Sequence, residues 1–554
     1  MRARPAPQPL QQRSGEPWVV GVSPLDRRRF ALGLLAGAGA TLSRAAMPAV
    51  EALSCHDPAA AFARAAAEEE GVAGSGARVR SPRWRAAFAS LTTDLEPLPM
   101  KLHGRLPRGL IGSFYRNGPA RHALGAVRYA HWFDGDGAVQ RYALGADGGV
   151  THQARFVRTE KYLADTAAGR PVRAAYGTWP PGAEPLRSPD SFNVANTHVL
   201  PHAGRLLALW EGGSAHAIDP RTLATLGPVR WADELAGMPF SAHPRIEPDG
   251  TMWNFGASHL QGLLTLYRIG ADGRLAEHHT LPVPDLPMLH DFAVTEHHLV
   301  FMLPPFVFEP ERLRAGATFH DSHVWRPALG LRVMVLDKAR LDAPPRWFTL
   351  PAGFVFHIGN AFESGGVIRL DCMRSASAWQ VQHGLTEVMC GAHQPQDHTQ
   401  PMVVELDLAT GRARQEVLAM AAEFPRVDPR FIGRPYRQVF AAEHRGAARR
   451  PGYDGVMRMD VQSGAIDRYG YGDDVLVEEH VFVPAAGGSG GSGSNGAGAA
   501  REGVGWLIGT ALDVARGETL FSVFDATRLA AGPVAQARML RLTPLALHGS
   551  FVPA

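Results

Sequence analysis

Cysteine is scarce in this chain: Cys55, Cys372 and Cys390 are the only three among 554 residues. No Cys-x-x-Cys pair occurs, which argues against zinc ribbons and thioredoxin-type redox motifs, and three cysteines cannot build a disulfide framework. A Cys372–Cys390 bridge is one option for the pair, but we favour buried free thiols, which are a common state of this residue.

Long hydrophobic runs and basic stripes are also missing. No stretch reaches 18 consecutive apolar residues, so the sequence predicts no transmembrane helix. The formal net charge is only +3, and lysine and arginine are scattered without interleaved aromatic residues, which argues against nucleic-acid binding. With 45% hydrophobic and 20% charged residues, the composition is that of a folded globular protein.

The N-terminal segment, residues 1–46, has the pattern of an export signal. Arg27 and Arg28 stand two residues before Phe30, and a short apolar run interrupted by glycines follows at 31–42. This pattern resembles a twin-arginine signal and predicts a periplasmic protein. The alternative is a disordered basic leader on a cytoplasmic protein. Residues 47–84 read as a partly disordered lead-in with a short helix at 59–70.

From about residue 85 the pattern changes to short apolar runs bounded by turn residues, which is typical of β-strands. Residues 264–273, 404–411 and 457–464 share a rhythm of strand, Asp/Gly turn and strand. Repetition of this kind indicates β-propeller blades. We therefore expect residues 85–554 to form one all-β propeller domain. The Gly/Ser-rich stretch at 485–500 is a flexible loop by composition.

Four widely separated histidines, His243, His290, His357 and His548, each stand in a distinct local phrase. Imidazole is a preferred ligand of iron, copper, zinc and nickel. The wide spacing excludes a local motif such as a zinc finger or an HExxH helix. The four side chains can share one metal only if distant parts of the fold bring them together, and spacing alone does not establish this among 24 histidines.

The phrases around these histidines carry a family resemblance. They are Ser-Ala-His-Pro at 241–244, Met-Leu-His-Asp-Phe at 288–292, Phe-His-Ile-Gly-Asn at 356–360 and Leu-His-Gly at 547–549. Preceded by Tyr-Arg-Asn-Gly-Pro at 115–119 and His-Trp-Phe-Asp-Gly-Asp-Gly at 131–137, they resemble the carotenoid cleavage oxygenase family in content and order. That family includes lignostilbene dioxygenases and the retinal pigment epithelium isomerase.

The resemblance implies a seven-bladed β-propeller with an axial metal site, capped by loops and helices that form a substrate tunnel. It implies that the four histidines bind one Fe²⁺ per chain. By the same resemblance Glu211, Glu423 and Glu479 orient His290, His357 and His548, because a ligating imidazole donates its other N–H to an acceptor. His243 has no glutamate, and Glu478, adjoining Glu479, leaves the last assignment open.

The implied reaction is cleavage of a conjugated carbon–carbon double bond of a carotenoid or apocarotenoid by O2, giving two carbonyl products. A lignostilbene-type phenolic alkene is the alternative substrate. Stilbene-cleaving relatives hold the phenol with a lysine and a tyrosine. Lys161 stands in a plausible position for that lysine and Tyr129 is a poorer match, so we favour surface or packing roles for both.

Two further readings remain open at this point. The apolar segment 301–308 fits three roles equally well: a lining of the tunnel or its mouth, a core strand, or a peripheral membrane contact. A protein of another class, a non-catalytic propeller that binds a partner and holds a structural metal or none, would leave the four histidines exposed or far apart.

Overall fold

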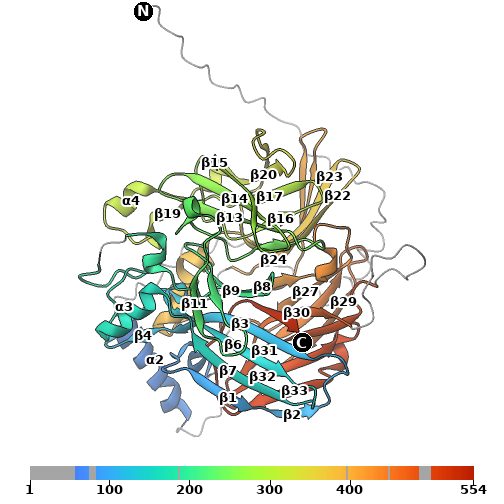
Figure 1. Ribbon diagram of the computed structural model, residues 1–554. Helices are drawn as coiled ribbons and strands as arrows, with labels where there is room; N and C mark the ends of the chain where they lie inside the picture. Colours follow the sequence, from blue (N-terminus) through green and yellow to red (C-terminus); the bar gives the residue numbers. More distant parts are fainter. Residues whose placement is uncertain (1–56, 74–82, 185–186, 395–396, 447–449, 486–500) are drawn as a thin grey trace, which may run out of the picture.

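The computed structural model describes residues 57–73, 83–184, 187–394, 397–446, 450–485 and 501–554. Antiparallel sheets form the body, and short helices and loops cover part of it (Figure 1). The export signal expected at 1–46 and nearly all of the loop expected at 485–500 lie outside these residues. None of the described helices is both long and apolar enough to cross a membrane.

Seven sheets of four or five antiparallel strands make up the described body, besides two short hairpins. We call each sheet a blade and name it by the strand nearest the axis. Four blades, in bonding order outward, are β8 (His198–His202), β9 (Arg205–Leu209), β10 (His216–Ile218), β11 (Thr225–Pro228); β12 (Arg245–Ile246), β13 (Met252–Ser258), β14 (Leu263–Ile269), β15 (Leu275–Pro282); β16 (Phe292–Val294), β17 (His298–Leu303), β20 (Leu331–Asp337), β21 (Arg346–Leu350); and β22 (Phe354–Ser364), β23 (Val367–Ser375), β24 (Gln400–Asp407), β25 (Ala413–Val417).

The other three blades are β26 (Ala421–Arg426), β27 (Gln438–His444), β28 (Gly455–Asp460), β29 (Ile466–Gly470); β30 (Val475–Pro484), β31 (Gly505–Asp513), β32 (Glu518–Asp525), β33 (Ala535–Met539), β2 (Lys101–Gly104); and β34 (Gly549–Pro553), β3 (Gly112–Arg121), β6 (Asp136–Leu144), β7 (Val150–Phe156), β1 (Leu95–Pro99). The innermost strands contact their neighbours in turn: β16 with β22, β22 with β26, β26 with β30, β30 with β34 and β34 with β8. This arrangement is the seven-bladed β-propeller that the resemblance implied.

The two ends of the domain close the ring together. The C-terminal strand β34 pairs with β3, from Arg116 opposite Gly549 to Gly112 opposite Pro553. On the neighbouring blade the N-terminal strand β2 pairs with β33. Because β34 is an innermost strand, this closure carries His548 from the end of the chain to the axis.

The repeated phrases mark equivalent turns. The turns at 264–273, 404–411 and 457–464 all join the third strand of a blade to its outermost strand. In two of them an aspartate, Asp407 or Asp460, accepts backbone N–H groups two and three residues on. Each turn ends on a glycine with positive φ, Gly411 at 71° and Gly464 at 69°, a conformation that glycine adopts without a Cβ clash.

Burial falls from the axis to the rim. Nine of the ten residues of the innermost strand β30 are buried, whereas the outermost strand β15 alternates between exposed and half-buried positions until its last two residues. An antiparallel strand with one face in solvent shows such alternation. The segment 301–308 belongs to the core: Phe301 stacks on Phe292 at 5.2 Å, and none of its residues lines the large cavity described below. Of the three alternatives left open for this segment, the core strand is therefore confirmed.

Short helices and two hairpins cover one side of the blades and supply the expected cap. The helices are α2 (Pro58–Ala73), α3 (Glu160–Ala168), α4 (Pro310–Arg314), α5 (Leu385–Glu387) and a π-helical turn η7 (Gln380–Gly384). The 3-10 turns are η1 (Trp84–Phe88), η2 (Trp132–Asp134), η3 (Pro189–Phe192), η4 (Asp233–Leu235), η5 (His320–Ser322), η6 (Pro327–Leu329), η8 (Val388–Cys390), η9 (Pro429–Phe431) and η10 (Leu529–Ala531), and the hairpins are β4 (Ala123–Leu124) with β5 (Val127–Arg128) and β18 (Phe306–Phe308) with β19 (His323–Trp325).

The lead-in contains the short helix expected in it. Helix α2 covers the helix expected at 59–70, and the guanidinium of Arg128 lies 3.6 Å from the ring centre of Phe62. A cation–π contact of this kind holds the helix against the cap.

The cysteines only partly match expectation. Cys372 is a buried free thiol, which excludes a Cys372–Cys390 bridge. Cys390 is buried but disulfide-bonded, so the prediction of free thiols was wrong for this residue.

Candidate metal centre

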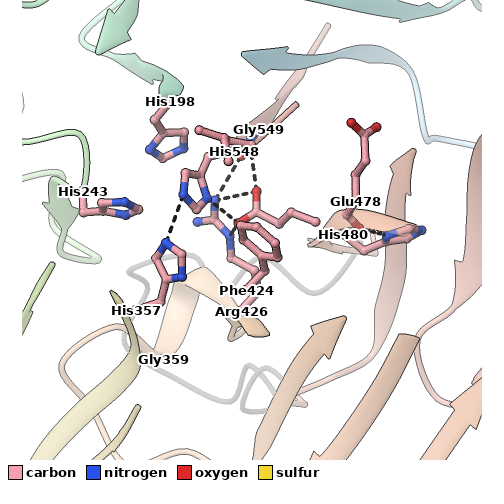
Figure 2. A network of polar contacts seen from close by, with 12 residues as sticks. His198, His243, His357, Gly359, Phe424, Arg426, Glu478, His480, His548 and Gly549 are labelled. Carbon is pink, nitrogen blue, oxygen red and sulfur yellow. Dashed lines mark hydrogen bonds and ion pairs between the residues drawn. The ribbon is translucent and has the colours of Figure 1, made fainter. Parts of the chain in front are cut away.

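Four of the innermost strands bring the four predicted histidines to one point. His243 and His290 stand two residues before β12 and β16, His357 lies in β22, and His548 directly precedes β34. All four are buried, and one ring nitrogen from each lies within 4.8 Å of the others. Figure 2 shows His243, His357 and His548 converging from different strands. A non-catalytic propeller without a metal would leave these histidines exposed or scattered. Their convergence excludes that arrangement.

The spacing of the ring nitrogens fits a shared ion. Nε2 of His243 lies 2.9 Å from Nε2 of His290, and Nε2 of His357 lies 3.1 Å from Nε2 of His548. Two metal–nitrogen bonds of about 2.1 Å that meet at a right angle separate their nitrogens by about 3.0 Å. The two measured distances are therefore those of adjacent ligands around one metal.

Three glutamates occupy the positions that the resemblance gave them. Glu211 lies 2.5 Å from Nδ1 of His290, Glu423 lies 2.6 Å from Nδ1 of His357, and Glu479 lies 2.9 Å from Nδ1 of His548. A carboxylate beside Nδ1 keeps the proton there and leaves Nε2 with a free lone pair. At the pair His357 and His548 the lone pairs of both Nε2 atoms then face each other without a proton to share, which a bound cation resolves.

The neutral state of the ring is the one that binds a metal. Burial, reinforced by the neighbouring imidazoles, lowers the pKa of His243 well below its usual value. Burial also lowers the pKa of His548 well below its usual value, although Glu479 acts in the opposite direction. Both rings are thus neutral near pH 7.

Glu479 is distinguished from its neighbour Glu478 by what each one binds. Arg426 donates two hydrogen bonds to Glu479, at 2.8 and 2.9 Å. Burial alone would raise the pKa of Glu479, but Arg426 and His548 outweigh it and hold that pKa well below its usual range. Glu478 instead accepts hydrogen bonds from Thr510 and from the backbone N–H of Ala546, and it points away from His548 (Figure 2).

An ion pair directly behind the ligands was missed by the sequence reasoning. Arg245, two residues after His243, donates to both carboxylate oxygens of Asp291, the residue after His290, at 2.7 and 2.6 Å. Its guanidinium also donates to the backbone carbonyls of Ile358 and Gly359, which follow His357. One side chain therefore joins the three innermost strands β12, β16 and β22. The signal was present, since Asp291 belongs to the phrase at 288–292.

A fifth histidine near the centre gave no signal in the sequence. His198 opens the innermost strand β8, and its ring centre lies 5.9 Å from that of His243 and 5.4 Å from that of His548. Its Nδ1 lies 2.8 Å from the carbonyl oxygen of Ala242, and burial lowers its pKa to about 4. It packs against two of the ligands but does not belong to the group of four.

A cavity of about 790 Å³ opens onto the centre, and His290, His357 and His548 form part of its wall. Phe356 packs edge-on against His290 at 5.2 Å, and Phe424 lies 5.3 Å from His357. Further aromatic side chains from the cap and the blades line it: Phe88, Trp132, Phe133, Tyr176, Trp179, Phe192, Trp210 and Tyr453. The cavity thus offers an apolar, aromatic space that reaches the metal site directly.

Lys161 and Tyr129 do not line this cavity. Lys161 is fully buried, and its Nζ contacts the hydroxyl of Tyr129 at 2.7 Å, Asp165 at 2.9 Å and Asp136 at 3.1 Å. Two carboxylates already neutralise the charge of this ammonium. The packing role favoured for Lys161 and Tyr129 is therefore confirmed, and a surface location is excluded.

The fold and the four-histidine centre define a class of protein: a seven-bladed β-propeller that holds a metal on its axis beneath an apolar cavity. Comparison with known proteins gives the family. The family model described as retinal pigment epithelial membrane protein matches residues 88–553. The chain belongs to this family, that of the carotenoid cleavage oxygenases, and is an enzyme of that family.

Individual relatives agree. The chain is 31% identical to apocarotenoid-15,15'-oxygenase of Synechocystis sp., over 86% of this chain and 97% of the relative. It is 28% identical to lignostilbene-alpha,beta-dioxygenase isozyme III of Sphingomonas paucimobilis, over 82% and 94%. The solved structure of cobalt-substituted Synechocystis apocarotenoid oxygenase superimposes with a TM-score of 0.76 at 28% identity, covering 85% of this chain and 98% of that one.

Proposed function

We propose that this protein is a non-haem iron(II) dioxygenase that cleaves a conjugated carbon–carbon double bond of a carotenoid or apocarotenoid into two carbonyl products. The observation that carries the proposal is the convergence of four Nε2 atoms at the wall of an aromatic cavity. An alkene held in the cavity lies beside the metal, and the apolar walls exclude water from the reacting bond.

Iron is the metal we propose for the centre. Four neutral imidazoles add no negative charge, and with them iron(II) keeps open positions and supplies the activation of O2. A zinc ion with four protein ligands is usually closed and structural. Here three of the four ligands line a cavity large enough for a substrate, which favours a catalytic metal.

Two observations favour the polyene over the stilbene. The volume of about 790 Å³ and the many aromatic side chains suit a long apolar chain. Lys161, the candidate for holding a phenolate, is already paired with Asp136 and Asp165 outside the cavity. A lignostilbene-type phenolic alkene remains the second candidate, because a dioxygenase named for that substrate is similar along most of its length.

The test is product analysis of the iron-loaded protein under O2, with one apocarotenal and one hydroxystilbene as substrates. Aldehyde products from the apocarotenal, at a kcat/KM at least about tenfold above that for the stilbene, support the proposal. The reverse preference selects the stilbene. Cleavage of neither alkene by protein that retains iron contradicts both substrate assignments.

We further propose export by the twin-arginine route and contact with a membrane surface. Export is supported by Arg27, Arg28 and Phe30, and membrane contact by Trp179 and Leu260, which line the cavity yet are 40% and 52% exposed. Replacing Arg27 and Arg28 by lysine should retain the protein in the cytoplasm. An unchanged periplasmic fraction would contradict export. Trp179→Ala should weaken binding to liposomes, and equal binding would contradict membrane contact.

A further inference from the structure

Four histidines that take no part in the metal centre line the same cavity: His259, and a group of three formed by His393, His398 and His444. The rings of His398 and His444 stack with their centres 5.4 Å apart. Neither ring nitrogen of His444 has a hydrogen-bond partner, nor does Nε2 of His393, although these atoms are closed to solvent. The nearest charge to His444 is a carboxylate oxygen of Asp454, 3.9 Å from Nδ1 and beyond hydrogen-bond distance. The His444 side chain is only 10% exposed. Buried polar atoms without partners are costly and rare, which indicates a ligand that completes them.

Strand pairing places His444 close to the glutamate that orients His357. His444 ends β27 opposite Ala421 of β26, two residues before Glu423, the partner of His357. The ring of Phe424 lies 5.3 Å from His357 and 5.8 Å from Tyr453, and both Phe424 and Tyr453 line the cavity. An aromatic wall therefore leads from the metal site towards the three histidines.

The opposite part of the cavity has a different character. Leu260 belongs to the β12 blade. Around the ring, two blades lie between the β12 and β26 blades on one side, and three blades lie between them on the other. There the lining includes the side chain of Leu260, which is 52% exposed, and its neighbour His259. The cavity wall thus takes residues from blades on both sides of the ring: His259 and Leu260 from the β12 blade, and His444 from the β26 blade.

Two of the three rings, those of His393 and His444, are held in the neutral state. Burial, with added repulsion from His444 and His398, lowers the pKa of His393 to about 4, and burial lowers the pKa of His444. A neutral imidazole offers one donor and one acceptor. The nearby Arg450 gives its N–H groups to the backbone carbonyls of Pro451, Tyr453, Gly472, Asp473 and Val475. The cluster therefore matches a hydroxyl or carbonyl group rather than a carboxylate, which would need a free cation.

We propose that His393, His398 and His444 form a subsite that binds a neutral oxygen substituent, a hydroxyl or a carbonyl, at one end of the polyene. The proposal rests on the proposed function, since it assigns the end group of that substrate. Anchoring one end fixes which double bond lies at the metal centre, so the subsite selects both the oxygenated substrate and the bond that is cleaved.

The test compares two apocarotenoids of equal chain length, one with a hydroxyl on its terminal ring and one without. Their Kd values are measured by quenching of the cavity tryptophans, so that the readout does not require activity. His444→Phe keeps the ring but removes both hydrogen-bonding nitrogens. It should weaken binding of the hydroxylated compound by about 5- to 10-fold, the value of one lost hydrogen bond, and leave the other compound unchanged.

Two variants serve as controls. His444→Gln keeps a donor and an acceptor and should restore most of the preference. His103→Phe places the same change on the exposed strand β2, outside the cavity, and should behave as wild type. Equal affinity of wild type for both compounds, or an equal loss of affinity for both in His444→Phe, overturns the subsite. So does a second bound Fe²⁺ or Zn²⁺ per chain that His444→Phe abolishes, since the trio would then be a metal site.

Cleavage of the same two compounds separates the subsite from the proposed function. Preferential binding of the hydroxylated compound without cleavage of either one contradicts the oxygenase and retains the subsite. Cleavage of both compounds with no preference in binding contradicts the subsite and retains the oxygenase.

Discussion

His290 and His357 each use one ring nitrogen toward the common centre and the other toward a glutamate. This division follows from the chemistry of imidazole, which has one protonated and one unprotonated nitrogen when neutral. The carboxylate determines which nitrogen carries the proton, and the fold then determines where the free lone pair points.

Replacing His290 by alanine should abolish metal retention and activity while leaving the fold intact. The change removes a ligand at the end of a loop without disturbing a strand ladder, because His290 lies before β16 rather than in it. Metal analysis and circular dichroism of the purified variant check this. Full metal occupancy in a folded His290→Ala protein would remove His290 from the ligand set.

Replacing Glu423 by glutamine should weaken metal binding by about 10- to 100-fold, as expected when the partner of a ligating histidine loses its charge. Titration of the metal-free variant with Fe²⁺ gives the affinity. Glu405→Gln is the matched control, because Glu405 is exposed on β24 away from the centre. Identical affinities for both variants would contradict the role of Glu423.

Among the elements, the innermost strands depend on the ion pair between Arg245 and Asp291. It ties β12, β16 and β22 together directly behind three ligands. Asp291 is 5% exposed, so its loss leaves a largely buried guanidinium without its counter-charge.

Asp291→Asn should lower the free energy of unfolding by about 3 kcal/mol, the cost of breaking a buried ion pair. It should also weaken metal binding, because the ligand strands are no longer held in register. Chemical denaturation and metal titration measure the two effects. In contrast, Glu277→Gln, which breaks the half-exposed pair with Arg268, should cost less than about 1 kcal/mol. Unchanged metal affinity in Asp291→Asn would show that the pair stabilises the sheets alone.

The strands could be predicted from the turns between them, and the site could be predicted from the phrases around the four histidines. The Asp/Gly turns at 404–411 and 457–464 were recognisable because aspartate side chains and glycine backbones form them locally. For Arg245 the sequence offered a signal only at its partner, Asp291, in the phrase at 288–292. The role of His198 was not recognisable, because its partners lie on other strands far away in the chain. The segment 301–308 was ambiguous for the same reason: its composition does not reveal which surface covers it.

At the scale of the whole molecule, buried histidines predict a loss of stability in acid. Burial lowers the pKa values of His122 and His480 to about 3, against 6.5 for an ordinary histidine. Between these values the unfolded chain binds protons that the folded protein does not, so stability falls as the pH falls from about 6.5. Each residue contributes about 1.4 kcal/mol per pH unit in this range.

Denaturant unfolding of the metal-free protein at pH 7 and pH 5 measures this effect without the separate pH dependence of metal binding. Burial accounts for the shift at both positions, so the free energy of unfolding should be several kcal/mol lower at pH 5. Equal stability at the two pH values would show that these histidines protonate in the folded state.

The propeller brings four imidazoles from distant parts of the chain to one point, where they can bind one ion. The most direct measurement is the metal content of the purified chain, before and after anaerobic loading with Fe²⁺. We expect one tightly held iron per chain after loading. A chain that retains no metal under these conditions would contradict this expectation, because the converging ring nitrogens of His243, His290, His357 and His548 would then have no ion to bind.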